Sequence, residues 1–373
     1  MKREEMQERL KHPVENMISY LKTMGHLTFE DRPFCEADAL ILSQLSYMQF
    51  PGFVPPPEKN QRNVGLLDFY DYYDKDEYYQ DIHHAKKNRE YYQALLVSDR
   101  FRNTRANYYV NKIGKVEESQ FCAITFFLEN GLVYVAFRGT DDNIIGWKED
   151  FNMAFLAPVP AQKKAMQYLN EIGKMIPGPL MVGGHSKGGN LAVYAAMRCD
   201  PTIQKRITAI YSHDGPGFRM ETFKTAEYDV IKSRIHKIVP HSSVIGMLLE
   251  EHEDYQTIAS YQVGVLQHDP YSWIIHNGEF VYEKDLNERR KKQNKILNEW
   301  ITSLQEEERQ IFVDNLFGIF LAAEKDTITE WTDDLKNSIL AASECVKEMD
   351  ESQRKMMQCM VKRLRWMRRG KRI

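Results

Sequence analysis

The chain has 373 residues, with 50 Lys and Arg against 53 Asp and Glu, so its formal net charge is −3. Hydrophobic residues make up 43% and aromatic residues 12% of the chain, which excludes wholesale disorder and is enough for a large core. The near-neutral charge argues against a dedicated nucleic-acid-binding protein.

The sequence predicts a cytoplasmic protein. No run approaches the roughly 18 apolar residues of a membrane-spanning helix, and the charged N-terminal residues lack the apolar region of a signal peptide. The cysteines form no CxxC pair, which excludes a zinc-finger spacing and a disulfide framework and fits a reducing compartment. They are Cys35, Cys122, Cys199, Cys345 and Cys359.

Composition divides the chain into three regions. We expect an N-terminal helical cap region over residues 1–95, a core over 96–282 and a C-terminal helical region over 283–373. Apolar residues between Ala39 and Met48 recur at helical spacing, and the proline-rich run that begins at Pro51 must end that helix.

A segment dense in tyrosine and acidic residues follows. Its acids and histidines are numerous enough to bind a metal ion, but they lack the glycine and the regular spacing of a calcium loop. We therefore expect no metal site and interpret the segment as a solvated cap whose tyrosines shape a lid over an apolar substrate. The residues concerned are Asp68, Tyr70, Asp71, Tyr72, Tyr73, Asp74, Asp76, Glu77, Tyr78, Tyr79, Asp81, His83 and His84.

The core region alternates strand and helix patterns. Two β-rich runs are separated by Glu129-Asn130-Gly131, and Asn-Gly is a strong hairpin signal. Strands that alternate with helices indicate the α/β class, with a mainly parallel sheet covered on both faces. The predicted strands are 121–128, 132–138, 180–184, 207–212, 234–239 and 257–265, and the predicted helices are 161–175 and 187–198.

The last region carries helical apolar stripes and a basic end. The stripes are typical of packing faces rather than of cofactor sites: Ile296, Leu297, Trp300, Ile301 and Leu304 form one, and Phe312, Leu316, Phe317 and Phe320 the other. Residues 361–373 hold seven basic residues with a tryptophan among them. This composition suits nucleic acid or an anionic membrane surface, and the latter would make the protein peripheral at the membrane. The alternative, which we favour, is a solvated helix end.

The strongest chemical signal is Gly184-His185-Ser186-Lys187-Gly188-Gly189, between a predicted buried strand and a helix of small residues. G-x-S-x-G in this context is a nucleophile elbow, in which a tight turn between small residues exposes the serine hydroxyl above the sheet edge. The helix N-terminus favours negative charge that develops near Ser186. The alternative is a phosphate-binding or purely structural glycine turn.

A second signal is Arg138-Gly139-Thr140 at the end of a predicted strand. In a serine hydrolase, an amide of an early loop and the amide that follows the nucleophile together bind the oxyanion. Thr140 and Lys187 would supply those two amides. By itself, the same tripeptide also fits a strand that ends in a turn.

The sequence FRGT…W..DF followed by GHSKGG resembles the class 3 lipases, which have an α/β-hydrolase fold. Most of residues 30–280, with YSHDGPGF, KIVPHSSVIGMLLE and QHDPYSW, resembles an uncharacterised bacterial family of lipase-like proteins, known as a domain of unknown function. The resemblance implies an α/β-hydrolase core, a nucleophile at Ser186 and an oxyanion loop at Thr140. Lys187 stands where those lipases usually carry leucine, a change that a backbone donor tolerates.

The triad acid departs from the class 3 pattern. In that pattern the acid begins a D-I-V-P stretch, whereas here Lys237 occupies the position, and a lysine cannot hold a histidine as a carboxylate does. Asp214 is the best substitute, since it follows the strand after the nucleophile helix, where animal-type lipases place their acid. The alternative is that Asp214 caps the Gly-Pro bend that follows it.

The histidines after Asp214 compete for the role of base, because the chain order in this fold is Ser, Asp, His. His268 lies in a polar turn after the last predicted strand, where this fold supplies its histidine. His241 is a candidate for a supporting role, and His276 for a packed and hydrogen-bonded one.

We therefore expect a serine hydrolase of the esterase or lipase type with no cofactor. Ser186 would attack a small-molecule or lipid ester, His268 would take its proton and Asp214 would orient His268. The alternative is a non-catalytic hydrolase-fold protein that binds a membrane or a protein partner through its helical tail, and Lys237 favours that reading.

Overall fold

The computed structural model describes residues 15–305, except 51, 60, 74, 76–84, 115–118, 142–143, 154–157, 219–221, 223 and 250–253. Beyond 305 it describes 308, 311, 313–315, 317–318, 322, 335–349, 351, 353–355 and 358. The chain forms two compact units: the first consists of residues up to 111, 121–139 and 162–287, and the second of the remaining segments. The boundaries at residues 95 and 282 between the three regions expected from the sequence stay predictions.

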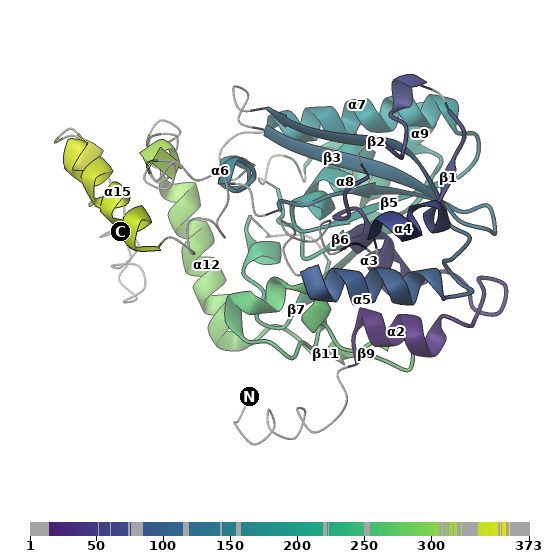
Figure 1. The fold of residues 1–373 in the computed structure, drawn as a ribbon. Coiled ribbons are helices and arrows are strands. Elements are labelled where there is room, and N and C mark those ends of the chain that lie inside the picture. Colours follow the sequence, from purple (N-terminus) through teal and green to yellow (C-terminus); the bar gives the residue numbers. More distant parts are fainter. Residues whose placement is uncertain are drawn as a thin grey trace, which may run out of the picture. The chain divides into compact units, whose positions relative to one another are not determined.

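A nine-stranded mixed sheet has the order β1-β2-β3-β4-β5-β6-β7-β8-β11 (Figure 1). Strands β4 to β8 are parallel, while β1/β2, β3/β4 and β8/β11 are antiparallel pairs. The strands are β1 (Val64–Gly65), β2 (Arg105–Gly114), β3 (Ser119–Phe127), β4 (Val133–Phe137), β5 (Leu180–His185), β6 (Ile207–His213), β7 (Ile235–Pro240), β8 (Gln256–Ile258) and β11 (Tyr282–Glu283). Strands β9 (Ile275–His276) and β10 (Glu279–Phe280) form a separate hairpin.

The predicted α/β class is confirmed, and so is the hairpin at Asn130-Gly131. Strands β3 and β4 pair antiparallel from Phe127↔Val133 to Ala123↔Phe137. Gly131 has a φ of 81°, a left-handed conformation that glycine adopts without steric cost, which explains the Asn-Gly signal.

Helices cover both faces of the sheet in the first unit. Gly184 faces α8 (Lys187–Arg198), since a Cβ there would collide with Gly188. Gly183 points to the opposite face, where Tyr134 donates a hydrogen bond to the carbonyl of Ala39 in α3 (Glu36–Leu45). On the α8 face lie α7 (Pro160–Met175) and α11 (Ala226–Ile231); on the α3 face lie α2 (Met17–Met24) and α5 (Ala85–Leu96), which run side by side in Figure 1.

Short helical turns complete the described elements of the first unit. They are α4 (Tyr70–Tyr73), α9 (Pro201–Gln204) and the 3₁₀ turns η1 (Pro57–Lys59), η2 (Leu66–Phe69), η4 (Lys232–Arg234), η5 (Ile245–Met247), η6 (Gly264–His268) and η7 (Pro270–Ser272).

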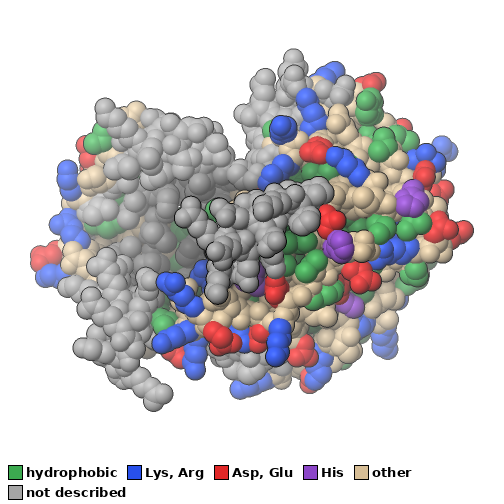
Figure 2. Space-filling view, turned by 90° about the horizontal axis from the view of Figure 1, so that it is seen from below, with side chains coloured by type: hydrophobic (Ala, Val, Ile, Leu, Met, Phe, Trp, Pro, Cys, Tyr) green, Lys and Arg blue, Asp and Glu red, His purple; other side chains and the backbone are tan. Residues whose placement is uncertain are grey.

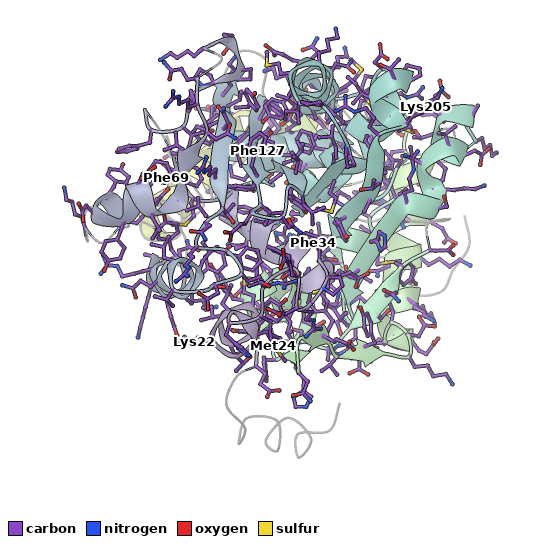
Figure 3. All side chains as sticks on the ribbon, turned by 90° about the vertical axis from the view of Figure 1, so that its right-hand side faces the viewer. Lys22, Met24, Phe34, Phe69, Phe127 and Lys205 are labelled. Carbon is purple, nitrogen blue, oxygen red and sulfur yellow. The ribbon has the colours of Figure 1, made fainter. Side chains whose placement is uncertain are left out.

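The N-terminal helices build a large aromatic core against the sheet. Phe34, which Figure 3 labels, lies before α3. Its ring lies 6.1 Å from that of Tyr134 and 5.9 Å from that of Tyr211, on two strands of the sheet. In the tyrosine-rich segment, Tyr73 is buried and donates a hydrogen bond to the carbonyl of Gln49. Residues 74 and 76–84 of that segment lie outside the described residues, so the lid remains a prediction.

The second unit contains α6 (Ile144–Met153), α12 (Glu288–Ser303) and α15 (Leu335–Glu348). Glu149 of α6 accepts hydrogen bonds from the amides of Gln120 and Ala161, both at 2.9 Å. The predicted stripe is buried at Trp300 and Ile301 of α12 and at Leu304, which directly follows the helix. Phe312, Leu316, Phe320 and the basic tail 361–373 lie outside the described residues.

One predicted strand is wrong. Instead of residues 257–265, strand β8 covers only Gln256–Ile258, and the chain continues through an isolated bridge at Ser260 to turn η6. Gly264 has a φ of 59°, a left-handed conformation that is not found in a strand, so the end of the predicted run lies in a turn.

Acidic and basic side chains are interleaved on the face shown in Figure 2, in keeping with the near-neutral net charge. Among the described residues, no helix combines the length and the apolar character needed to cross a bilayer. In the same part of the chain, no three His, Cys, Asp or Glu side chains are grouped as metal ligands would be.

A fully buried ion pair joins α3 to the turn after α5. The guanidinium of Arg100 contacts both carboxylate oxygens of Asp38, with Nε–Oδ1 at 2.7 Å and Nη2–Oδ2 at 2.6 Å. Asp38 also accepts hydrogen bonds from the Tyr20 hydroxyl and the Cys35 amide. The remaining guanidinium donors reach the backbone carbonyls of Leu27, Thr28, Arg32 and Pro33.

Replacing Arg100 with Leu should destabilise the protein strongly. The substitution leaves a buried carboxylate without its cation, which costs about 3–5 kcal/mol. Urea unfolding followed by tryptophan fluorescence measures the loss. The matched control is Lys22→Gln, which breaks an exposed ion pair with Glu90 and should cost less than about 1 kcal/mol. Equal losses in the two variants would contradict a structural role for the Asp38–Arg100 pair.

Candidate active site

Ser186 occupies the turn between β5 and α8. Its backbone has a φ of 59° and a ψ of −133°, a conformation that costs a non-glycine residue roughly 1–3 kcal/mol. The turn is held by hydrogen bonds from the Ser186 amide to the His213 carbonyl and from the Gly189 amide to the Ser186 carbonyl, both at 2.9 Å. The predicted strand-to-helix elbow is therefore present in the structure.

The glycines around Ser186 are required by close packing. A Cβ on Gly188 would collide with the carbonyl oxygen of Phe137, and one on Gly184 would collide with the backbone of Gly188. Helix α8 thus approaches the ends of β4 and β5 at backbone contact distance, which is why the motif needs small residues there.

Three side chains from three segments form one hydrogen-bonded chain. His268 Nε2 lies 2.9 Å from Ser186 Oγ, and His268 Nδ1 lies 2.6 Å from Asp214 Oδ2. Ser186 and Asp214 are buried, whereas the His268 side chain is 21% exposed. A carboxylate that accepts from one imidazole nitrogen leaves the other free to take a hydroxyl proton, so this arrangement can activate a serine.

Asp214 is fixed from several sides at the end of β6. It has a φ of 50°, and its amide donates to the carbonyl of Ile238 at 2.8 Å. Its second carboxylate oxygen, Oδ1, accepts from the hydroxyl of Ser243 at 2.5 Å, and that hydroxyl in turn accepts from the Gly246 amide at 3.1 Å. A Cβ on Gly246 would collide with Asp214 Oδ1, so this turn packs directly on the carboxylate.

The loop that carries His268 is held by side chains around it. The Gln267 side chain accepts from the Ser242 amide at 2.8 Å and donates to the Gln262 carbonyl at 2.7 Å. Asp269 accepts from the Tyr271 amide and forms an ion pair of 2.8 Å with Lys87 of α5. The imidazole of His268 therefore projects from a turn that hydrogen bonds and an ion pair hold in place.

Two buried histidines lie directly before the elbow serine and the acid. His185 pairs with His213 in the parallel register of β5 and β6. Burial, followed by the nearby His268, holds the pKa of His185 well below its usual range. Burial likewise lowers the pKa of His213 to about 4, so both imidazoles are neutral at pH 7.

The predicted oxyanion residues are placed only in part. Gly139 packs against the His185 carbonyl and the side chain of Ser186, so the strand β4 leads directly to the elbow. Thr140 belongs to the second unit, where its hydroxyl donates to Asp150 at 2.6 Å. Lys187 begins α8, where amides of the first turn lack carbonyl partners within the helix. The oxyanion roles of Thr140 and Lys187 stay predictions.

The other candidate histidines have different partners. His241 contacts the side-chain amide of Gln267 at 3.2 Å, and His276 is exposed and pairs with Glu15 at 2.5 Å. Sequence reasoning missed Ser243, although it lies within the KIVPHSS segment that carries the resemblance. It also missed the hydrogen bonds of His185 to His268 and Tyr47. The position of His185 directly before the serine was the only feature of the sequence that could have pointed to them.

The pH dependence of stability provides a test of the buried His213. In the unfolded chain this imidazole takes a proton near pH 6.5, but in the folded protein only near pH 4. Its contribution is therefore complete above pH 6.5 and is lost as the pH falls towards 4, by about 1.4 kcal/mol per pH unit.

Urea unfolding of the parent and of His213→Gln between pH 4 and pH 8 measures this contribution as a difference. The free energy of unfolding should fall less steeply with acid in the variant. Parallel curves for the two proteins would show that His213 does not titrate as its burial predicts.

Comparison with known proteins places the chain in a family. The sequence profile described as Mbeg1-like matches residues 95–318, which cover the elbow, the acid and the histidine loop. Neither the curated proteins nor the solved structures contain a match. Because the match covers more than half of the chain, the protein belongs to the Mbeg1-like family, a family of lipase-like proteins.

Proposed function

We propose that this protein is a serine hydrolase that cleaves carboxylic esters. Ser186 is the nucleophile, His268 the general base and Asp214 the residue that orients His268. The observation that carries the proposal is the continuous chain of hydrogen bonds from Ser186 Oγ through His268 to Asp214, at 2.9 and 2.6 Å. Membership of a lipase-like family supports the same chemistry.

The proposal includes the α/β-hydrolase fold. Its support is the parallel strands β4 to β8, the elbow between β5 and α8, and the order Ser186, Asp214, His268 along the chain. Asp214 follows β6, the strand beside the nucleophile strand. The position that the class 3 pattern gives to the acid holds Lys237, a buried residue of β7.

In the proposed reaction, Ser186 Oγ attacks the ester carbonyl while its proton moves to His268 Nε2. The imidazolium keeps its Nδ1–H hydrogen bond to Asp214, which stabilises the new charge. Collapse of the tetrahedral intermediate breaks the C–O bond to the alcohol, which leaves with the proton from His268. Water then attacks the acyl carbon and gives a proton to His268 Nε2. The bond from the acyl carbon to Ser186 Oγ breaks, the proton passes from His268 to Oγ, and the acid is released. The amides of Thr140 and Lys187 are the proposed donors to the oxyanion.

The substrate we propose is a small-molecule or lipid ester with an apolar acyl group. Two large apolar side chains before His268 support this class, since Val263 is 50% and Leu266 is 59% exposed. Val263 caps turn η6 and Leu266 lies within it, so both belong to the turn that carries His268. Exposed apolar side chains that are grouped in one segment are typical of surfaces that contact apolar ligands. The proposed reaction uses no cofactor. An anionic membrane surface remains a proposed partner of the tail, and nucleic acid is not a proposed partner.

Replacing Asp214 with Asn tests the proposed triad. Loss of the orienting carboxylate should lower kcat for a short-chain p-nitrophenyl ester by about 10⁴-fold, because the imidazole adopts the wrong tautomer. Ser186→Ala should be at least as impaired. Asp229→Asn is the matched control. Asp229 of α11 forms an exposed ion pair with Lys232, so this variant should retain the parent rate.

Activity in the Asp214→Asn variant equal to that of the parent would refute Asp214 as the acid. A parent that hydrolyses no short-chain or long-chain ester would refute the enzymatic proposal and favour a non-catalytic protein that binds a membrane or a protein partner.

A further inference from the structure

His185 links the nucleophile elbow to the loop of the base. Its imidazole is buried, and its Nε2 lies 2.9 Å from the backbone carbonyl oxygen of His268. A carbonyl oxygen can only accept a hydrogen bond, so Nε2 of His185 must carry the proton. The rings of His185 and His268 are 4.6 Å apart and inclined by 32°.

The opposite nitrogen of His185 has a partner that fits this tautomer. His185 Nδ1 lies 3.1 Å from the hydroxyl of Tyr47, which follows α3. Since Nε2 holds the proton, Nδ1 accepts and the Tyr47 hydroxyl donates; the same hydroxyl has a longer contact, of 3.4 Å, with the backbone carbonyl of His185. The low pKa that burial gives His185 keeps the ring in this neutral form. Tyr47 therefore donates a hydrogen bond to His185, and His185 donates one to the backbone carbonyl of His268.

A second buried donor holds the neighbouring carbonyl. The indole Nε1–H of Trp273 donates to the carbonyl oxygen of Gln267 at 2.7 Å. Trp273 is buried and meets His185 edge to face, with ring centres 5.7 Å apart. Two consecutive carbonyls of turn η6, those of Gln267 and His268, are thus fixed by two ring N–H groups that pack against each other.

We propose that His185 is a positioning residue for the base. It acts through the backbone of His268 and keeps His268 Nε2 within reach of Ser186 Oγ; this inference rests on the proposed function. A displacement of about 1 Å in a reacting group can cost about 10²-fold in rate. The neutrality of His185 is part of the role, since a cation 4.6 Å from His268 would oppose its protonation during the reaction.

The rate at which a fluorophosphonate labels Ser186 tests the role directly. His185→Leu retains a buried apolar volume but removes the donor, and should lower the labelling rate about 10²-fold. His185→Gln restores an N–H near the same point and should recover most of that loss. Ser186→Ala is the unlabelled reference. His276→Gln is the matched control, since His276 is an exposed histidine outside the site.

Selective ¹⁵N NMR of the histidine side chains provides a readout that is independent of activity. His185 should be neutral with its proton on Nε2 at pH 6 and pH 8. In Tyr47→Phe, which loses the donor to Nδ1, the population of that tautomer and the labelling rate should fall together.

The possible outcomes separate the two proposals. A parent that does not label refutes the proposed function and with it the role of His185. If the parent labels and the His185→Leu variant labels at the same rate, the positioning role of His185 is refuted and the proposed function is not. The positioning role is also refuted if the His185→Gln variant is folded but labels as slowly as His185→Leu. It is refuted as well if His185 of the parent carries its proton on Nδ1 at pH 8.

Discussion

The parallel register of β5 and β6 is the constraint on which the site depends. His185 pairs with His213, so the residues that follow them, Ser186 and Asp214, leave the sheet side by side at the same edge. Both residues have positive φ angles, of 59° and 50°, which turn the chain abruptly after each strand. A slip of one residue between these strands would move the serine and the acid apart and turn the histidine of the slipped strand to the opposite face of the sheet.

The same register shows where a carboxylate can come from when a lysine occupies the acid position of the class 3 lipase pattern. Lys237 is buried in β7 opposite Ser212 of β6, and the carboxylate at the edge of the sheet comes from Asp214 instead. The segment after β7 still contributes to the site, because Ser243 binds the Asp214 carboxylate oxygen that does not face His268. In the proposed triad the acid therefore follows β6, and Ser243, in the segment after β7, supports its carboxylate.

The sequence allowed the elbow to be predicted because its determinants are local. Gly184, Ser186 and Gly188 lie within five residues, and the buried strand and small-residue helix beside them have clear periodicities. Asp214 and His268 could be proposed from chain order and from strand ends. The hairpin at Asn130-Gly131 was predictable for the same local reason.

Other features depend on contacts between distant segments and could not be predicted. The strand-like pattern of residues 257–265 conceals both the end of β8 at Ile258 and the turn that begins at Gly264, where φ is positive. Ser243 and its partner Asp214 are 29 positions apart in the sequence, and His185 and its partner His268 are 83 positions apart. No periodicity or motif reports such pairs, since they arise only when the turns after several strands meet.

The central claim, that Ser186 is an activated nucleophile, is tested most directly by trapping the acyl-enzyme. The protein is mixed with an excess of a p-nitrophenyl ester, quenched in acid within the first turnover and analysed by intact mass and peptide mapping. We predict a mass increase of one acyl group per chain, located on Ser186 and absent from Ser186→Ala. An acyl group on another side chain, or the absence of any adduct while ester is hydrolysed, would contradict the claim.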